Sequence, residues 1–131
     1  MKNLEELIQR AIGNKENSYS PYSNFRVSAL VLTKTGKLYE GINIENASYS
    51  ATLCAERSAL AAAISAGERK FDTIIITGDS EDTFPCGVCR QFMAEFFDDD
   101  TKLVIANSVS DYKIYTMDDL LPHSFSKKDL E

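Results

Sequence analysis

The sequence predicts an α/β fold in which helices cover a five-stranded mixed sheet. Amphipathic and alanine-rich segments alternate with short β-branched runs, which is the element order of a layered α/β protein. Two of these runs are joined through a helix and should pair in parallel. The last two runs are separated only by Ser108 to Asp111, a connection that closes a hairpin and makes the final pair antiparallel.

The first part of the chain predicts one helix and a β-hairpin. Leu4, Leu7, Ile8 and Ala11 follow the i, i+3, i+4, i+7 spacing of an amphipathic helix, and Gly13 ends it. A polar loop, SYSPYSN, comes next. The strand-like stretch FRVSALVLT, the turn KTGK and the return stretch LYEGINI then predict two antiparallel neighbours.

The rest of the chain predicts three helices and three strands. The stretch LCAERSALAAAISA predicts a helix that stops at Gly67, and its alanines favour close packing on the sheet. FDTIIITG is a buried strand, and Pro85 stands at the start of the next helix, CGVCRQFMAEFF. KLVIAN and YKIYT are the last two strands. Thr116 caps a short helix, MDDLL, which Pro122 ends.

Length, composition and charge limit the function. With 131 residues, 44% of them hydrophobic, the chain fits one domain, residues 1–131. The formal net charge is −6 and no basic stripe is present, so nucleic acid and anionic membrane are poor partners. No signal peptide or transmembrane segment is visible, and we expect a cytoplasmic protein. Three cysteines in a reducing compartment argue against a disulfide framework.

The three cysteines predict a metal site that is open on one side. Cys54 is expected in the first turn of the alanine-rich helix, and Cys86 and Cys89 share one face in the first turn of the next. Helix N-termini favour thiolates, so three ionised sulfurs could converge. No fourth cysteine exists, and the only histidine, His123, lies in the tail. If a metal is bound, the ligand count points to a catalytic site with room for water.

Two charged residues follow Cys54. A carboxylate at Glu56 could take a proton from water at such a site. Arg57 lies three residues after Cys54, where it could hydrogen-bond the sulfurs and offset their charge, and Gln91 could orient Arg57. Taken alone, Glu56 and Arg57 could be solvated helix residues, and the Cys-x-x-Cys pair could be buried or redox thiols. The combined spacing favours the metal site.

These motifs carry a resemblance. CAE followed by PCGVCRQ resembles the all-cysteine form of the zinc-dependent deaminase signature, in which a Glu accompanies the zinc ligands without binding zinc. From YSPYSNF through GINIENASY and CAERSAL to LLPHSF, the chain resembles the small cytidine deaminases of free nucleosides. One departure is Ser28, where many relatives carry Gly. The resemblance implies a three-layer α/β/α sandwich, a homotetramer, and one zinc ion per subunit held by Cys54, Cys86 and Cys89.

The resemblance also implies a set of substrate contacts. The matching positions are Phe25, Asn43, Ile44, Glu45, Tyr49, Ala55 and Phe125. In the family, the residues at Asn43 and Glu45 hold ribose hydroxyls, and the aromatic at Phe25 packs on the pyrimidine. The aromatic at Phe125 enters the pocket of a neighbouring subunit.

The implied reaction is hydrolysis of free cytidine and 2′-deoxycytidine to uridine and 2′-deoxyuridine plus ammonia, in pyrimidine salvage. An activated water adds at C4, and Glu56 moves the proton of that water to N3 and then toward the leaving amine. One alternative is a deaminase of a cytosine-containing nucleoside antibiotic, which the NIEN motif disfavours. Another is a catalytically silent zinc-binding module, which would not need Glu56. A polynucleotide deaminase is disfavoured by the acidic charge and the short final hairpin.

Overall fold

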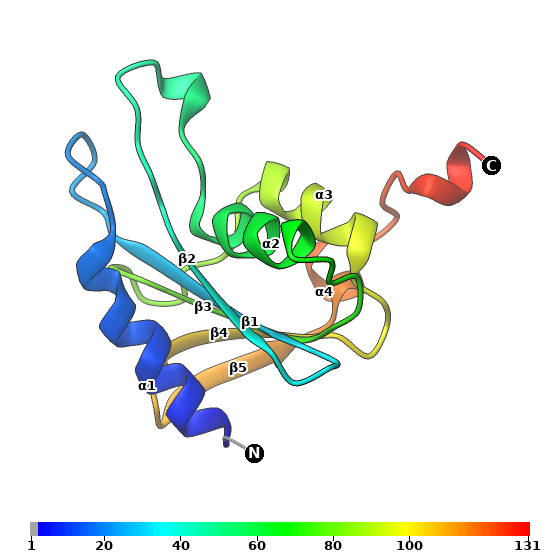
Figure 1. Ribbon diagram of the computed structural model, residues 1–131, viewed down its shortest axis with the longest axis horizontal. Coiled ribbons are helices and arrows are strands. Elements are labelled where there is room, and N and C mark those ends of the chain that lie inside the picture. The colour runs from blue at the N-terminus through cyan, green and yellow to red at the C-terminus, as the bar shows by residue number, and fades with distance from the viewer. Residues whose placement is uncertain (1–2) are drawn as a thin grey trace.

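The structure, a computed structural model shown in Figure 1, describes residues 3–131. With 3₁₀ helices written η, the order of elements is α1 (Leu4–Asn14), η1 (Lys15–Asn17), β1 (Val27–Thr33), β2 (Leu38–Ile42), η2 (Tyr49–Ala51), α2 (Ala55–Ser65), β3 (Phe71–Gly78), α3 (Gly87–Phe96), β4 (Lys102–Ser108), β5 (Asp111–Tyr115), α4 (Met117–Leu120) and η3 (Lys127–Asp129). The predicted order of α-helices and strands is confirmed.

The five strands form one mixed sheet in the order β2-β1-β3-β4-β5. β1 pairs antiparallel with both β2 and β3, and β3 pairs in parallel with β4 through the crossover that contains α3. β4 and β5 are antiparallel, as the short connection between them predicts. The parallel pair directs the C-terminal end of β3 toward the loop that carries Pro85 and Cys86.

Helices cover both faces of the sheet, which confirms the three-layer prediction (Figure 1). On one face, Leu7, Ile8 and Ala11 of α1 pack against buried side chains of β1, β3 and β4. The other face packs against α2, α3 and α4, and its core includes Ala59, Leu60, Met93 and Leu120.

The alanine-rich helix α2 lies very close to the sheet. Gly41 of β2 has no side chain, and a Cβ placed there would stand 2.3 Å from the amide nitrogen of Ala59 and 2.5 Å from the carbonyl oxygen of Ala55. The predicted close packing of the alanines is therefore confirmed, and it depends on glycine in the facing strand.

Two strands are shorter than their sequence patterns predict, because the extra residues bond elsewhere. The run from residue 25 to 33 becomes a strand only at Val27, since the amide of Arg26 donates to the carboxylate of Asp79 at 2.8 Å. The run from residue 38 to 44 leaves the ladder after Ile42. Ile44 instead forms isolated bridges to Tyr19 and Leu53.

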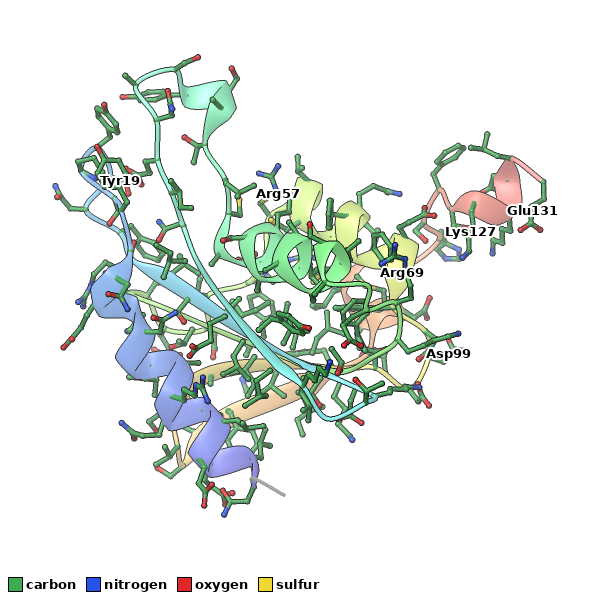
Figure 2. All side chains as sticks on the ribbon, in the orientation of Figure 1. Tyr19, Arg57, Arg69, Asp99, Lys127 and Glu131 are labelled. Carbon is green, nitrogen blue, oxygen red and sulfur yellow. The ribbon has the colours of Figure 1, made fainter. Side chains whose placement is uncertain are left out.

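The C-terminal tail leaves the body of the molecule after α4 and ends in η3, as the red segment of Figure 1 shows. Lys127 and Glu131, labelled in Figure 2, lie on this projecting segment. Across residues 3–131, none of the helices has the length and apolar character needed to cross a membrane.

Candidate active site

The three cysteine sulfurs come together between the starts of α2 and α3. The Sγ atoms of Cys54 and Cys86 are 3.8 Å apart, those of Cys86 and Cys89 are 3.5 Å apart, and all three lie within 4.8 Å of one another. Zinc–sulfur bonds of about 2.3 Å in a tetrahedron place sulfurs about 3.8 Å apart, so the spacing fits a zinc ion. No fourth Cys, His, Asp or Glu joins this group within residues 3–131.

Each helix places one candidate metal ligand at the same structural position. Cys54 and Cys86 are the N-cap residues of α2 and α3, rather than residues of the first turn as predicted. Neither side chain caps its helix with a hydrogen bond, so both sulfurs remain available to a metal. Cys89 follows in the first turn of α3 and is buried. The unpaired amides at both helix starts favour negative charge on these sulfurs.

Arg57 lies beside the thiols, as predicted. Its Nη2 is 3.5 Å from Cys54 Sγ and 3.4 Å from the carbonyl oxygen of Thr52. The pKa of Cys54 is lowered to about 5, first by its hydrogen bond with Cys89 and then by the nearby guanidinium of Arg57. That same bond to Cys54 and burial raise the pKa of Cys89, because one proton remains between the two sulfurs. A thiolate is thus favoured at Cys54, beside the Arg57 guanidinium.

Glu56 is a buried acid with an unpaired oxygen. Its side chain is in the first turn of α2, only 3% of the residue is exposed, and Oε1 has no hydrogen-bond partner in the described chain. Burial away from water raises the pKa of Glu56 above its ordinary value. A buried carboxyl group with one oxygen left unpaired is placed to exchange a proton with a ligand.

Asn43 and Glu45, at the end of β2, bond mostly within the chain. The Asn43 amide donates to Phe25 O at 2.8 Å, and its Oδ1 accepts from the Val27 amide at 3.0 Å and from the Ser18 hydroxyl. These three bonds leave one N–H of Asn43 without a partner in the described chain.

Glu45 holds the loop before β1. Its Oε1 accepts from the amides of Tyr22 and Ser23, both at 3.0 Å, and its Oε2 accepts from the Ser23 hydroxyl. The hydroxyl bond first, and the amide bonds with it, lower the pKa of Glu45, so the group stays ionised. One acceptor position on Oε2 remains for a further donor.

The remaining predicted contacts differ in how far the subunit encloses them. Ala55 is fully buried and Phe25 is half-buried, whereas Ile44 is exposed and Tyr49 is 74% exposed on η2. Tyr49 packs edge to face on Tyr22, with ring centroids 5.9 Å apart. A cavity of about 340 Å³ lies here, lined by Tyr22, Ser23, Glu45, Tyr49 and Thr52.

Gln91 contacts the tail, and among the described residues the printed bonds of Arg57 go to Thr52 and Cys54, so the role of Gln91 in orienting Arg57 stays a prediction. The Gln91 Nε2 donates to the carbonyl oxygen of Phe125 at 2.8 Å. Gln91 comes two residues after Cys89, and helix positions two apart do not share a face. The Phe125 backbone is therefore fixed to α3, while 61% of the residue remains exposed.

Sequence reasoning missed Ser18, Ser23 and Arg90. Ser18 and Ser23 belong to the polar stretch SYSPYSN, whose hydroxyls contact Asn43 and Glu45. The density of hydroxyls in that stretch was the available signal, but it does not tell which distant side chain each one meets. Arg90 follows the candidate ligand Cys89 directly, and its guanidinium donates to the carbonyl groups of Pro85 and Leu120.

A larger cavity, of about 720 Å³, lies on the opposite face of the sheet from the thiols. Its lining includes Leu7 of α1, Leu32 and Leu38 of the first hairpin, and Asp100. None of its lining residues is a predicted site residue. We therefore locate the candidate site by the thiols, Glu56 and the smaller cavity, and not by the larger cavity volume.

Comparisons with known proteins identify similar chains. Residues 1–106 match the family model described as the cytidine and deoxycytidylate deaminase zinc-binding region. The chain is 45% identical to a cytidine deaminase from Halalkalibacterium halodurans, with 95% of each chain covered. It is 42% identical to one from Sporosarcina psychrophila, with 97% of this chain and 94% of the relative covered. The crystal structure of a cytidine deaminase from Burkholderia pseudomallei has a TM-score of 0.89 and 40% identity, covering 95% of this chain and all of that one.

Proposed function

This chain belongs to the cytidine deaminase family, and we propose that it hydrolyses free cytidine and 2′-deoxycytidine to uridine and 2′-deoxyuridine with release of ammonia, in pyrimidine salvage. The observation that carries this proposal is the pairing of three converging thiols with a buried Glu56 whose Oε1 has no hydrogen-bond partner in the described chain. A purely structural zinc site closes its coordination shell with a fourth ligand and has no use for such a carboxyl group.

The donor set fits one zinc ion per subunit, held by Cys54, Cys86 and Cys89. Zinc bound there would supply Lewis acidity to a water at the coordination position that three thiolates leave open. Three thiolates exceed the charge of a zinc ion, and the guanidinium of Arg57 beside Cys54 offsets that excess.

Glu56 performs the proton transfers. Its carboxylate accepts a proton from the attacking water, which adds to C4 of the cytosine ring, and delivers that proton to N3. A second proton then passes through Glu56 to the amino group, which leaves as ammonia while the C4 carbonyl forms. Burial raises the pKa of Glu56, which makes its carboxylate a stronger base toward the attacking water.

The sugar is held at the end of β2. Asn43 retains one free N–H and Glu45 retains one free acceptor position, after their bonds within the chain are counted. A hydroxyl group both accepts and donates, so one ribose hydroxyl can satisfy the two side chains together. Ser18 and Ser23 support this contact, because their hydroxyl groups donate to Asn43 and Glu45 and so fix the two side chains.

The base is enclosed by Phe25, Ile44, Tyr49 and the backbone of Ala55, and by an aromatic side chain from another subunit. In the described subunit, Phe125 projects with most of its surface exposed. We assign it to the pocket of a neighbouring copy in a homotetramer, and we assign the protein to the cytoplasm. Exposed Tyr49, Val88 and Leu130 support an assembly that covers them.

The test compares the wild type with Glu56→Gln. The wild type should release ammonia from cytidine and deoxycytidine with about one zinc per subunit, but not from a cytosine-containing oligonucleotide. Glu56→Gln should retain zinc and fold while kcat falls at least ~100-fold, the usual size of a general acid–base contribution. Glu95→Gln, an exposed acid on α3, is the matched control and should retain full activity.

Three results would reject the proposal. Near wild-type turnover in Glu56→Gln would remove that residue from the reaction. Zinc binding without ammonia release from either nucleoside would favour the catalytically silent zinc-binding module. Ammonia release from a cytosine-containing antibiotic nucleoside alone would show that the antibiotic, and not cytidine, is the substrate.

A further inference from the structure

The side chain of Arg90 connects the segment that carries the thiols to the start of the tail. Arg90 follows the ligand Cys89 on α3, and its side chain bonds two backbone carbonyl groups that are far apart in the sequence. Its Nε donates to Pro85 O at 2.8 Å, and its Nη1 donates to Leu120 O at 2.7 Å. Pro85 directly precedes the ligand Cys86, and Leu120 is the last residue of α4, directly before the tail.

The turn before α3 depends on Arg90 through both backbone and side chain. The Arg90 amide donates to Cys86 O at 2.9 Å, so one residue satisfies the carbonyl groups of both Pro85 and Cys86. Pro85 is buried. Without the guanidinium, its carbonyl oxygen would lose its partner in a place that water reaches poorly, and the turn would have to move to regain one.

An aromatic pair holds the guanidinium in place. The Arg90 guanidinium lies over the ring of Phe84, 6.0 Å from its centroid, and Phe84 packs edge to face on Tyr115 at 5.5 Å. The planar fork of arginine can reach two carbonyl groups and an aromatic face at the same time, which lysine cannot do.

We propose that Arg90 is a positioning residue for the metal centre. Its guanidinium joins the turn that carries Cys86 to the end of α4 and so fixes the position of the Cys86 thiol. Because Gln91, the next residue, holds Phe125 O, the same helical turn also sets where the tail begins. The position of the thiol of Cys86 and the path of the tail toward a neighbouring subunit are therefore linked through one side chain.

Arg69 provides a matched control. Its Nη1 also donates to two carbonyl groups, Ile64 O at 2.9 Å and Glu68 O at 2.8 Å, but at the last turn of α2. Figure 2 shows Arg57 beside the first turn of that helix and Arg69 near the opposite end. Arg69→Lys thus removes a comparable pair of contacts far from the thiols.

The test measures zinc release from the purified holoprotein to a competing chelator. Arg90→Lys should weaken zinc binding at least ~10-fold, the range found for residues that orient metal ligands, whereas Arg69→Lys should stay within about twofold of wild type. Amide hydrogen exchange of residues 121–126 should accelerate in Arg90→Lys and stay unchanged in Arg69→Lys, because only the first variant releases the end of α4.

Phe84→Ala keeps the test decisive if Arg90→Lys does not fold. Phe84 is 41% exposed, so its removal spares the core, and it should weaken zinc binding about two- to fivefold through the lost support for the guanidinium. An affinity in Arg90→Lys equal to that of Arg69→Lys would overturn the proposal, and so would wild-type zinc affinity in Phe84→Ala if Arg90→Lys does not fold. Because the role of Arg90 rests on the proposed function, ammonia release is measured separately: a wild type that binds zinc without deaminating would reject that function and not the role of Arg90.

Discussion

Substitution of Gly41 by alanine tests how closely α2 lies on the sheet. The new Cβ would stand 2.3 Å from the amide nitrogen of Ala59, whereas ordinary van der Waals contact begins at 3.4 Å. The opposing atoms belong to helix backbone and cannot rotate away, so α2 must retreat by about 1 Å. Overpacking of this kind costs typically 1–3 kcal/mol, and the upper end applies here because the clash includes the Ala55 carbonyl oxygen as well.

The same retreat should reach the site. Cys54 and Glu56 stand at the start of α2, while Cys86 and Cys89 belong to α3 and would stay behind. Misplacement of a reacting group by about 1 Å can cost on the order of 100-fold in rate, so Gly41→Ala should lose activity as well as stability.

Urea unfolding, zinc content and ammonia release measure the three effects together. Gly13→Ala is the control, since a Cβ on that residue of α1 meets no atom within 4 Å. It should leave activity unchanged and raise the free energy of unfolding by up to about 1 kcal/mol, the helix preference of alanine over glycine. Gly41→Ala with wild-type stability and wild-type zinc content would show that α2 does not pack on β2 as described.

Three further substitutions test separate features. Ser28→Ala should raise the free energy of unfolding by about 1 kcal/mol, because the buried Ser28 hydroxyl has no partner in the described chain; a loss of stability in thermal unfolding would refute this. The hydrogen bond from Arg26 holds the pKa of Asp79 at about 2, below its ordinary value, so that bond stabilises the fold above about pH 4 and is lost as the pH falls toward 2. Asp79→Asn should therefore be less stable than wild type at pH 7, with the difference shrinking in urea titrations at lower pH; a constant difference would contradict the assignment. Phe125→Ala should raise KM about tenfold in steady-state assays if the ring enters a neighbouring pocket, and an unchanged KM would confine it to its own subunit.

The fold was predictable because its signals are local. Alternation of β-branched runs with the alanine-rich stretch sets the element order, and the short connection from Ser108 to Asp111 sets the direction of β5. The metal centre was predictable for a similar reason. Cys54, Cys86 and Cys89 each lie at or near a helix start, and α/β folds bring such helix starts together at one end of the sheet.

Side-chain contacts between distant residues could not be predicted in this way. The bond from Gln91 to Phe125 O was not predicted, because the path of the tail decides which face of α3 is covered. Arg90 gave no signal of its own, since an arginine on a helix is usually solvated and its two carbonyl partners come from other segments. The strand ends were misjudged for the same reason: Ile44 continues the β pattern but bonds to two loops.

If Glu45 binds a sugar hydroxyl as proposed, the bonds that already occupy its carboxylate bear on which nucleosides are rejected. Its carboxylate stays ionised and has a single lone pair left, which only a hydrogen donor can use. A sugar oxygen that carries a phosphate has no hydrogen to donate and brings a second negative charge toward the first. Phosphorylation at that oxygen, or its linkage into a polymer, would thus turn an attraction into a repulsion, and the enzyme would exclude nucleic acid by charge at one atom rather than by the size of its entrance.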